Sequence, residues 1–294
     1  MRRIAILLAV GAVAAAPRSS AAQAQAVDLF RLGAKELAAG QVDKAIESFE
    51  KGVQLRSDAK EGWYNLGVAY GRKKVYAKEI QAYQKALELD PNYANALHNL
   101  GLAYLDLGQK DKAVETLTKA AKVDPAAGDA WNNLGVSLLG KGDNAGAADA
   151  FRKAAEVAPG SAESRFNLGI ALLRLADAEG STERRDPILR QAQKADDDAL
   201  ALDAKYHRAA YNKAAVLHRL RDRDGEVAAY RSAIAIKPDY GPALYNLGAA
   251  LSAGGDKDAA VKAWEDYVKA AGADPAEKPF VDNARKEIAR LQAL

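Results

Sequence analysis

The stretch that decides the fold is Trp63-Tyr64-Asn65-Leu66-Gly67-Val68-Ala69-Tyr70, because its central Asn-Leu-Gly triplet returns along the chain. Full or weakened copies stand at Arg31-Leu32-Gly33, Asn99-Leu100-Gly101, Asn133-Leu134-Gly135, Asn167-Leu168-Gly169, Asn212-Lys213-Ala214 and Asn246-Leu247-Gly248. Successive copies begin 34 residues apart, except for one step of 45 between positions 167 and 212. A fixed period of this length is the sequence signature of a solenoid built from stacked repeats.

Within one period, apolar residues fall at helical spacing on two successive segments, and a proline follows the second segment. In the period that begins at Lys60 they are Trp63, Leu66, Gly67 and Tyr70, then Ile80, Tyr83, Ala86 and Leu87, with Pro91 after them. This pattern resembles the tetratricopeptide repeat (TPR). The next period matches it at Leu97, Leu100, Gly101, Tyr104, Ala113, Leu117, Ala120 and Pro125. The resemblance implies an all-α fold, a right-handed α-α superhelix of about seven helix–turn–helix repeats.

The predicted repeats are 26–59, 60–93, 94–127, 128–161, 162–206, 207–240 and 241–274. Residues 275–294 are predicted to form a C-terminal capping helix, with an apolar stripe of Phe280, Ala284, Ile288 and Leu291. Glycines stand where a left-handed residue is expected to end the first helix of a repeat, at Gly40, Gly108, Gly142 and Gly255.

The fifth repeat carries 11 additional residues around the polar stretch 177–186. We interpret this stretch as a loop that is either simply solvated or contacts a partner. Asp186-Pro187 is interpreted as the N-cap and first residue of the helix after the loop. Asp196 replaces the usual aromatic residue and is followed by Asp197 and Asp198. Because successive helix positions point about 100° apart, these three carboxylates predict a solvated face rather than a cation site.

The N-terminal segment 1–24 is predicted to be a signal peptide, with a basic start, an apolar run over 4–16 and an Ala22-Gln23-Ala24 cleavage pattern. The apolar run is too short to span a bilayer. Cleavage removes three arginines and no acid from a chain of formal charge +3, leaving 39 basic and 39 acidic residues. Nucleic-acid binding is therefore not expected. Without cysteine, the chain has no disulfide and no lipid-modified cysteine, so we expect a protein exported to a bacterial periplasm without a stable membrane anchor.

The resemblance places positions 2, 5, 6, 9, 12 and 13 of each first helix on a concave groove. Position 6 holds Asn65, Asn99, Asn133, Asn167, Asn212 and Asn246, and position 5 adds Tyr64, His98, Phe166, Tyr211 and Tyr245. Each amide offers two donors and an acceptor, which suits the backbone of an extended peptide. These asparagines also belong to the repeat consensus. Their recurrence is explained either by selection for a row of binding residues or by common ancestry of the repeats.

No catalytic constellation is present in the sequence. The three histidines lack metal-ligand spacing, and no serine stands in a nucleophile elbow. The sequence therefore predicts a non-enzymatic protein without metal or cofactor. The leading hypothesis is an exported scaffold that binds an extended segment of a partner protein in the groove and assembles an envelope complex. The alternative is self-association into a homo-oligomer through the divergent first repeat.

Overall fold

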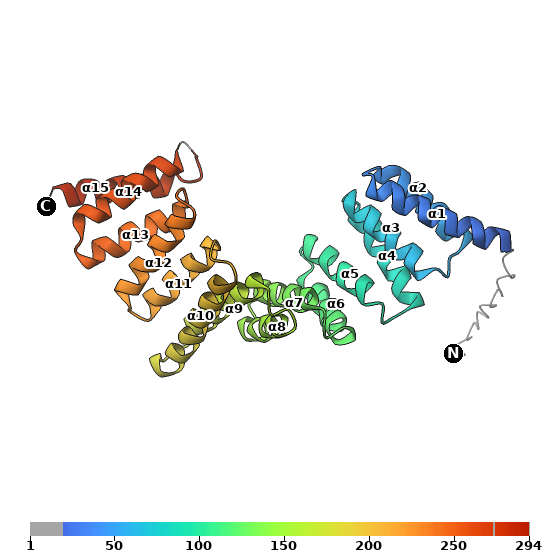
Figure 1. Ribbon diagram of the computed structural model, residues 1–294, viewed down its shortest axis with the longest axis horizontal. Helices are drawn as coiled ribbons and strands as arrows, with labels where there is room; N and C mark the ends of the chain where they lie inside the picture. Colours follow the sequence, from blue (N-terminus) through green and yellow to red (C-terminus); the bar gives the residue numbers. More distant parts are fainter. Residues whose placement is uncertain (1–19, 273, 294) are drawn as a thin grey trace, which may run out of the picture. The chain divides into compact units, whose positions relative to one another are not determined.

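The computed structural model describes residues 20–272 and 274–293, and every regular element within them is an α-helix (Figure 1). The helices are α1 (Ser20–Ala38), α2 (Val42–Leu55), α3 (Lys60–Arg72), α4 (Tyr76–Leu89), α5 (Ala94–Asp106), α6 (Lys110–Val123), α7 (Gly128–Lys141), α8 (Asn144–Val157), α9 (Ala162–Asp177), α10 (Thr182–Leu202), α11 (His207–Arg219), α12 (Arg223–Ile236), α13 (Gly241–Gly254), α14 (Lys257–Ala271) and α15 (Lys278–Gln292). The predicted all-α class is confirmed. Residues 1–19 of the predicted signal peptide lie outside the described residues.

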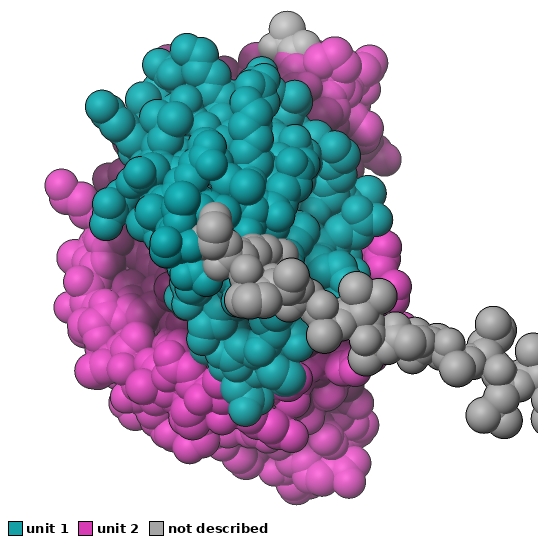
Figure 2. Space-filling view, turned by 90° about the vertical axis from the view of Figure 1, so that its right-hand side faces the viewer, with its two compact units in different colours: residues 1–107 teal, residues 108–294 magenta. Residues whose placement is uncertain are grey.

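The chain divides into two compact units, shown in different colours in Figure 2. Unit 1 extends to Leu107 and contains α1 to α5, and unit 2 extends from Gly108 to the C-terminus and contains α6 to α15. The boundary lies in the turn inside the predicted repeat 94–127, and each unit is described by itself below.

Helices pack in antiparallel pairs that stack on the next pair, which is the helix–turn–helix packing expected of the repeats. In unit 1, α1 packs on α2 and α3 on α4, and α3 also contacts α1 and α5. In unit 2 the pairs are α7 with α8, α9 with α10, α11 with α12, and α13 with α14, and α9 contacts both α7 and α11. First helices of neighbouring repeats therefore lie side by side and form one face within each unit.

The tight approach within a pair depends on the glycine of the Asn-Leu-Gly triplet. A Cβ added to Gly135 would lie 2.6 Å from the ring of Phe151, which is fully buried. Gly67 meets Tyr83 in the same way, and Gly248 meets Trp264. The aromatic side chain of the second helix thus packs directly on the backbone of the first, where any larger residue must displace it.

The turn between the helices of a repeat requires a left-handed residue, as the glycines predict. Gly40, Gly108, Gly142 and Gly255 all have positive φ, between 68° and 87°. The same turn position holds Lys74 and Arg221 in the repeats 60–93 and 207–240, with φ of 59° and 62°. These two side chains accept a backbone conformation that ordinarily favours glycine.

The insertion in the fifth repeat is helical, and the predicted loop over 177–186 is wrong. Helix α9 runs to Asp177 and α10 begins at Thr182, so only four residues separate them. Ser181 caps α10, accepting a hydrogen bond from the backbone N–H of Arg184, and Pro187 lies inside the helix. Burial explains the extension, because Leu189 of α10 is fully enclosed in a core shared with α9. That apolar contact outweighs the hydrogen bond that the proline cannot donate.

Helix α15 packs on α14 through Val281, Ala284 and Leu291, all of which are buried. Phe280, predicted to lie in this apolar stripe, is 53% exposed, because Val281 rather than Phe280 faces the core. None of the helices in the described part of the chain has the length and apolar character needed to cross a bilayer.

Candidate functional site

The predicted site residues lie on the first helices of the repeats, in two separate groups. Unit 1 carries Tyr64, Asn65, His98 and Asn99 on α3 and α5, and unit 2 carries Asn133, Phe166, Asn167, Tyr211, Asn212, Tyr245 and Asn246 on α7, α9, α11 and α13. Within each unit neighbouring first helices contact one another, and α13 reaches α11 through the hydrogen bond of Asn246 to Tyr211, so the residues share a face of that unit.

The asparagine amides link neighbouring repeats. Asn99 donates to the hydroxyl of Tyr64 over 3.2 Å, and Asn246 donates to the hydroxyl of Tyr211 over 2.9 Å. Asn167 likewise donates to the side-chain oxygen of Asn132 over 3.1 Å. In each case the amide of position 6 bonds to position 5 of the preceding repeat. Asn99 and Asn246 also form hydrogen bonds with Tyr83 and Tyr230 of the second helices, so the amide N–H groups serve the fold and the amide oxygen can serve a ligand.

Two predicted site residues are buried, and for them the prediction of an exposed binding surface is wrong. The ring of Phe166 is 3% exposed, because Tyr206 packs against it and the guanidinium of Arg208 lies 4.7 Å from its centroid. Asn212 is 9% exposed and donates over 2.8 Å to Asp196. Neither side chain is available to a partner while these contacts persist.

Asp196 is itself fully buried, so the predicted solvated face is also wrong at this position. It takes the place of the aromatic residue, with Oδ1 lying 2.6 Å from where a Cβ on Gly169 would be. Its Oδ1 has no hydrogen-bond partner. Burial raises the pKa of Asp196 well above its ordinary value, opposed by the hydrogen bond from Asn212. Its neighbour Asp197 pairs instead with Lys213 over 2.6 Å.

A hollow of about 540 Å³ opens between α11 and α13, with α12 beneath it. Tyr211 and Asn246 line it, and the small side chains of Ala249 and Ala253, both exposed, leave it open. Arg219 and Arg223 stand at this hollow, the first bound to Asp177 through two hydrogen bonds. The hollow therefore combines amide and phenol groups, apolar surface and positive charge.

Sequence reasoning missed the contribution of α12 to this hollow, namely Arg223, Glu226 and Tyr230. Glu226 is 7% exposed, and its Oε1 lies 3.1 Å from Nδ1 of His218. A signal was present in the sequence. Glu226 stands at position 20 of its repeat, where the family pattern has alanine, and a buried acid at a small-residue position requires a partner.

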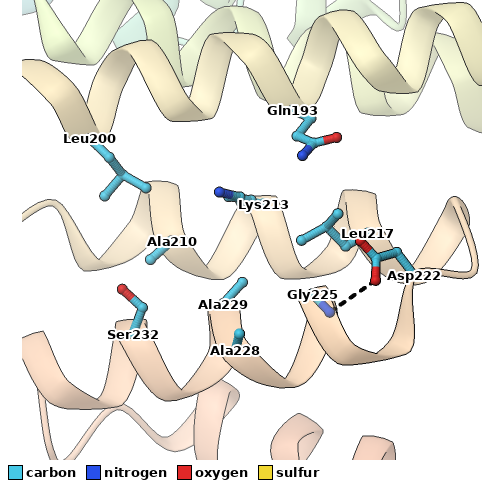
Figure 3. Close-up of a pocket in the computed structure, with 10 residues that line it drawn as sticks. All are labelled: Gln193, Leu200, Ala210, Lys213, Leu217, Asp222, Gly225, Ala228, Ala229 and Ser232. Atoms are coloured by element: carbon cyan, nitrogen blue, oxygen red, sulfur yellow. Dashed lines mark hydrogen bonds between the residues drawn. The ribbon is translucent and has the colours of Figure 1, made fainter.

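Two further hollows involve none of the predicted site residues. One, of about 360 Å³, lies between α10, α11 and α12, and Figure 3 shows Gln193 and Lys213 projecting into it. The other, of about 590 Å³, lies in unit 1 between α2, α3 and α4 and is lined by Trp63 and Tyr70 among others. No group of three or more His, Cys, Asp or Glu side chains in residues 20–272 and 274–293 is placed to hold a metal ion.

Paired helices, glycine-to-aromatic contacts and left-handed turns at a constant period define an α-helical repeat protein. Tetratricopeptide repeat models match residues 98–162, 137–181 and 242–271, and a TPR repeat model matches 33–74 and 76–108. The chain belongs to the tetratricopeptide repeat family, whose members are non-catalytic scaffolds that bind protein or peptide partners. No curated protein matches the sequence.

Solved structures share the fold at low sequence identity. YrrB, described as a TPR protein with an unusual peptide-binding site, is 23% identical, and the match covers 68% of this chain and 98% of YrrB at a TM-score of 0.59. A tetratricopeptide repeat protein from Parabacteroides merdae is 14% identical over 89% of this chain and 99% of its own, with a TM-score of 0.60. PilF of Pseudomonas aeruginosa is 17% identical over 74% and 94%, with a TM-score of 0.58.

Proposed function

We propose that this protein is an exported TPR scaffold that binds an extended segment of a partner protein on the first-helix face and so assembles an envelope complex. The observation that carries the proposal is the hollow between α11 and α13. Family members bind peptides, and YrrB is described as having a peptide-binding site. The predicted signal peptide supports export and a periplasmic location.

The chemistry of the hollow suits an extended backbone. Asn246 already bonds to Tyr211 and to Tyr230, which fixes its orientation and leaves its amide oxygen to accept from a peptide N–H. Fixing an amide before binding lowers the entropy cost of the new hydrogen bonds. Ala249 and Ala253 leave space for a ligand side chain, and Arg223 supplies a charge near the edge.

The test is to fill the hollow without removing any hydrogen bond. Ala249→Trp places an indole in it, whereas the matched control Ala228→Trp places one on an exposed alanine of α12, in the hollow of Figure 3. We expect crosslinking pull-down from an envelope extract to recover a partner with the parent and Ala228→Trp proteins, and at least about tenfold less with Ala249→Trp. Circular dichroism confirms that each variant is folded.

The other outcomes have definite meanings. Equal recovery with both variants overturns the groove proposal. Self-crosslinks without any other partner favour the homo-oligomer, which sedimentation at high concentration then measures. Export is tested separately, because N-terminal sequencing of the protein from an envelope fraction is expected to begin at Gln25. An N-terminus at Met1 in that fraction overturns the processing step.

A further inference from the structure

Position 20, the fourth residue of the second helix, holds a buried acid in two repeats. Elsewhere this position holds fully buried alanine, at Ala45, Ala113, Ala147 and Ala260. In the repeats 60–93 and 207–240 it holds Glu79 and Glu226, which are 8% and 7% exposed. A carboxylate at this depth is unfavourable unless it is protonated or has a partner of opposite charge or hydrogen-bonding capacity.

The two repeats differ in how that requirement is met. In repeat 207–240 the partner is internal, since His218 at position 12 of the first helix bonds to Glu226 over 3.1 Å. In repeat 60–93, position 12 is Gly71, which has no side chain. The Glu79 carboxyl lies against this glycine, with Oε1 only 2.6 Å from where a Cβ would be, and Oε2 has no hydrogen-bond partner.

Several cations close to Glu79 in sequence have other partners, and Lys73 pairs with Asp43 over 2.5 Å. Arg72 donates to the backbone oxygen of Leu37 over 2.9 Å, and the ammonium of Lys78 lies 5.1 Å from the ring centroid of Tyr70. The charged group that most affects the ionisation of Glu79 is another acid, Asp106, at the end of α5. Burial first, and the charge of Asp106 second, raise the pKa of Glu79 to about 7. The Glu79 carboxyl thus lies buried with an oxygen that has no hydrogen-bond partner.

We propose that Glu79 forms an anionic subsite that receives a lysine or arginine side chain of the bound partner segment. The inference rests on the proposed peptide-binding function and names one side chain that the segment carries. The incoming cation takes the role that His218 plays for Glu226. A single buried carboxylate suits one organic cation, whereas the three or more grouped ligands of a metal site are absent from the described residues.

The placement fits a segment on the first-helix face. Gly71 follows Tyr64, a predicted binding residue, by seven positions on α3, which is two helical turns or roughly 10 Å. An extended segment covers this distance in about three residues. A ligand that contacts Tyr64 can therefore place a basic side chain over Gly71.

The test is display selection of random 12-residue peptides on the folded chain, in parallel with Glu79→Gln. We expect selection on the parent protein to enrich one lysine or arginine at a fixed place in a motif, and selection on Glu79→Gln to lose that residue while keeping the rest. Enrichment of peptides without a basic position overturns the subsite but leaves the binding face intact. Failure to enrich any peptide on either protein overturns the proposed function and this inference with it.

A double-mutant cycle on the enriched peptide separates direct pairing from a structural effect. Replacing its basic residue by norleucine is expected to weaken binding to the parent at least about tenfold and to leave binding to Glu79→Gln unchanged. Raising the pH from 6 to 8 ionises Glu79 and is expected to tighten binding to the parent only. Additive effects in the cycle, or equal pH dependence in both proteins, overturn the pairing. Asp282→Asn, on α15 of unit 2, is the matched charge control.

Discussion

Replacing Asp196 by asparagine is expected to change the stability of unit 2 by an amount that becomes more favourable to the variant as the pH rises. Asp196 is fully buried, accepts one hydrogen bond of 2.8 Å from Asn212 and leaves Oδ1 without a partner. Asparagine keeps an acceptor for Asn212 and has nearly the same shape, but it cannot ionise. The substitution therefore removes the cost of burying a charge while leaving the packing against Gly169 almost unchanged.

The magnitude follows from the direction of the pKa shift. Burial raises the folded-state pKa of Asp196 above the ordinary value of 3.8, so above pH 3.8 the unfolded chain has lost a proton that the folded chain keeps. The free energy of unfolding contributed by this group is fully present below pH 3.8 and falls by about 1.4 kcal/mol per pH unit until the folded pKa is passed. The Asp196→Asn variant lacks this fall in the free energy of unfolding with pH, because asparagine does not ionise. Its amide N–H₂, placed where Oδ1 lay, lacks an acceptor and costs about 1–3 kcal/mol at every pH.

Urea unfolding followed by circular dichroism at pH 4.5, 5.5, 6.5 and 7.5 measures the difference between the two proteins. We expect the free energy of unfolding of the variant, relative to that of the parent, to rise with each step in pH. The slope of this difference against pH, and not its value at a single pH, tests the prediction. Asp197→Asn is the control, because that neighbouring side chain is half-exposed and pairs with Lys213. Parallel curves for Asp196→Asn and the parent refute the reasoning, since they show that Asp196 ionises equally easily in both states.

Two further predictions concern the repeat geometry, and both are checked by the same unfolding measurement. Arg221→Gly is expected to stabilise the fold by about 1 kcal/mol, because the turn holds that residue at φ of 62°, whereas Gly142→Ala at the equivalent turn is expected to cost about as much. Gly135→Ala is expected to destabilise by about 1–3 kcal/mol, because its Cβ would lie 2.6 Å from the Phe151 ring. No effect at Gly135 contradicts the close-packing argument, and a loss at Arg221 contradicts the strain argument.

The repeat period, the pairing of helices and the left-handed turns could all be predicted from the sequence, because each is a local rule applied many times. The glycine of the triplet and the large side chain opposite it are separated by a fixed number of residues in each ordinary repeat, and that side chain is aromatic in most of these repeats and Leu117 in the repeat 94–127. Gly135 and Phe151 illustrate this, since one repeat predicts the contact in the others. Because the repeats are this regular, the fold can be predicted from the sequence without any knowledge of long-range contacts.

The fifth repeat could not be read in this way, because packing overrides local signals there. Polar residues and the Asp186-Pro187 pair resemble a loop followed by a helix start, yet the segment is helical from Thr182. The burial of Leu189 against α9 and its neighbours explains this, and the sequence does not show that contact. Similarly, the environment of Asp196 depends on Asn212, on a different helix and 16 residues away.

The asparagines of the triplet show why consensus and function need not be alternatives. Asn99 and Asn246 each use an N–H to bind a tyrosine hydroxyl of the preceding repeat, so the residue is needed for stacking whether or not a ligand is present. That same hydrogen bond holds the rest of the amide in one orientation. An amide oriented by the fold binds a peptide group at a lower entropy cost than a free one. Selection for stacking therefore also prepares the face for an extended ligand, and the specificity must come from residues outside the consensus, such as Glu79 and Arg223.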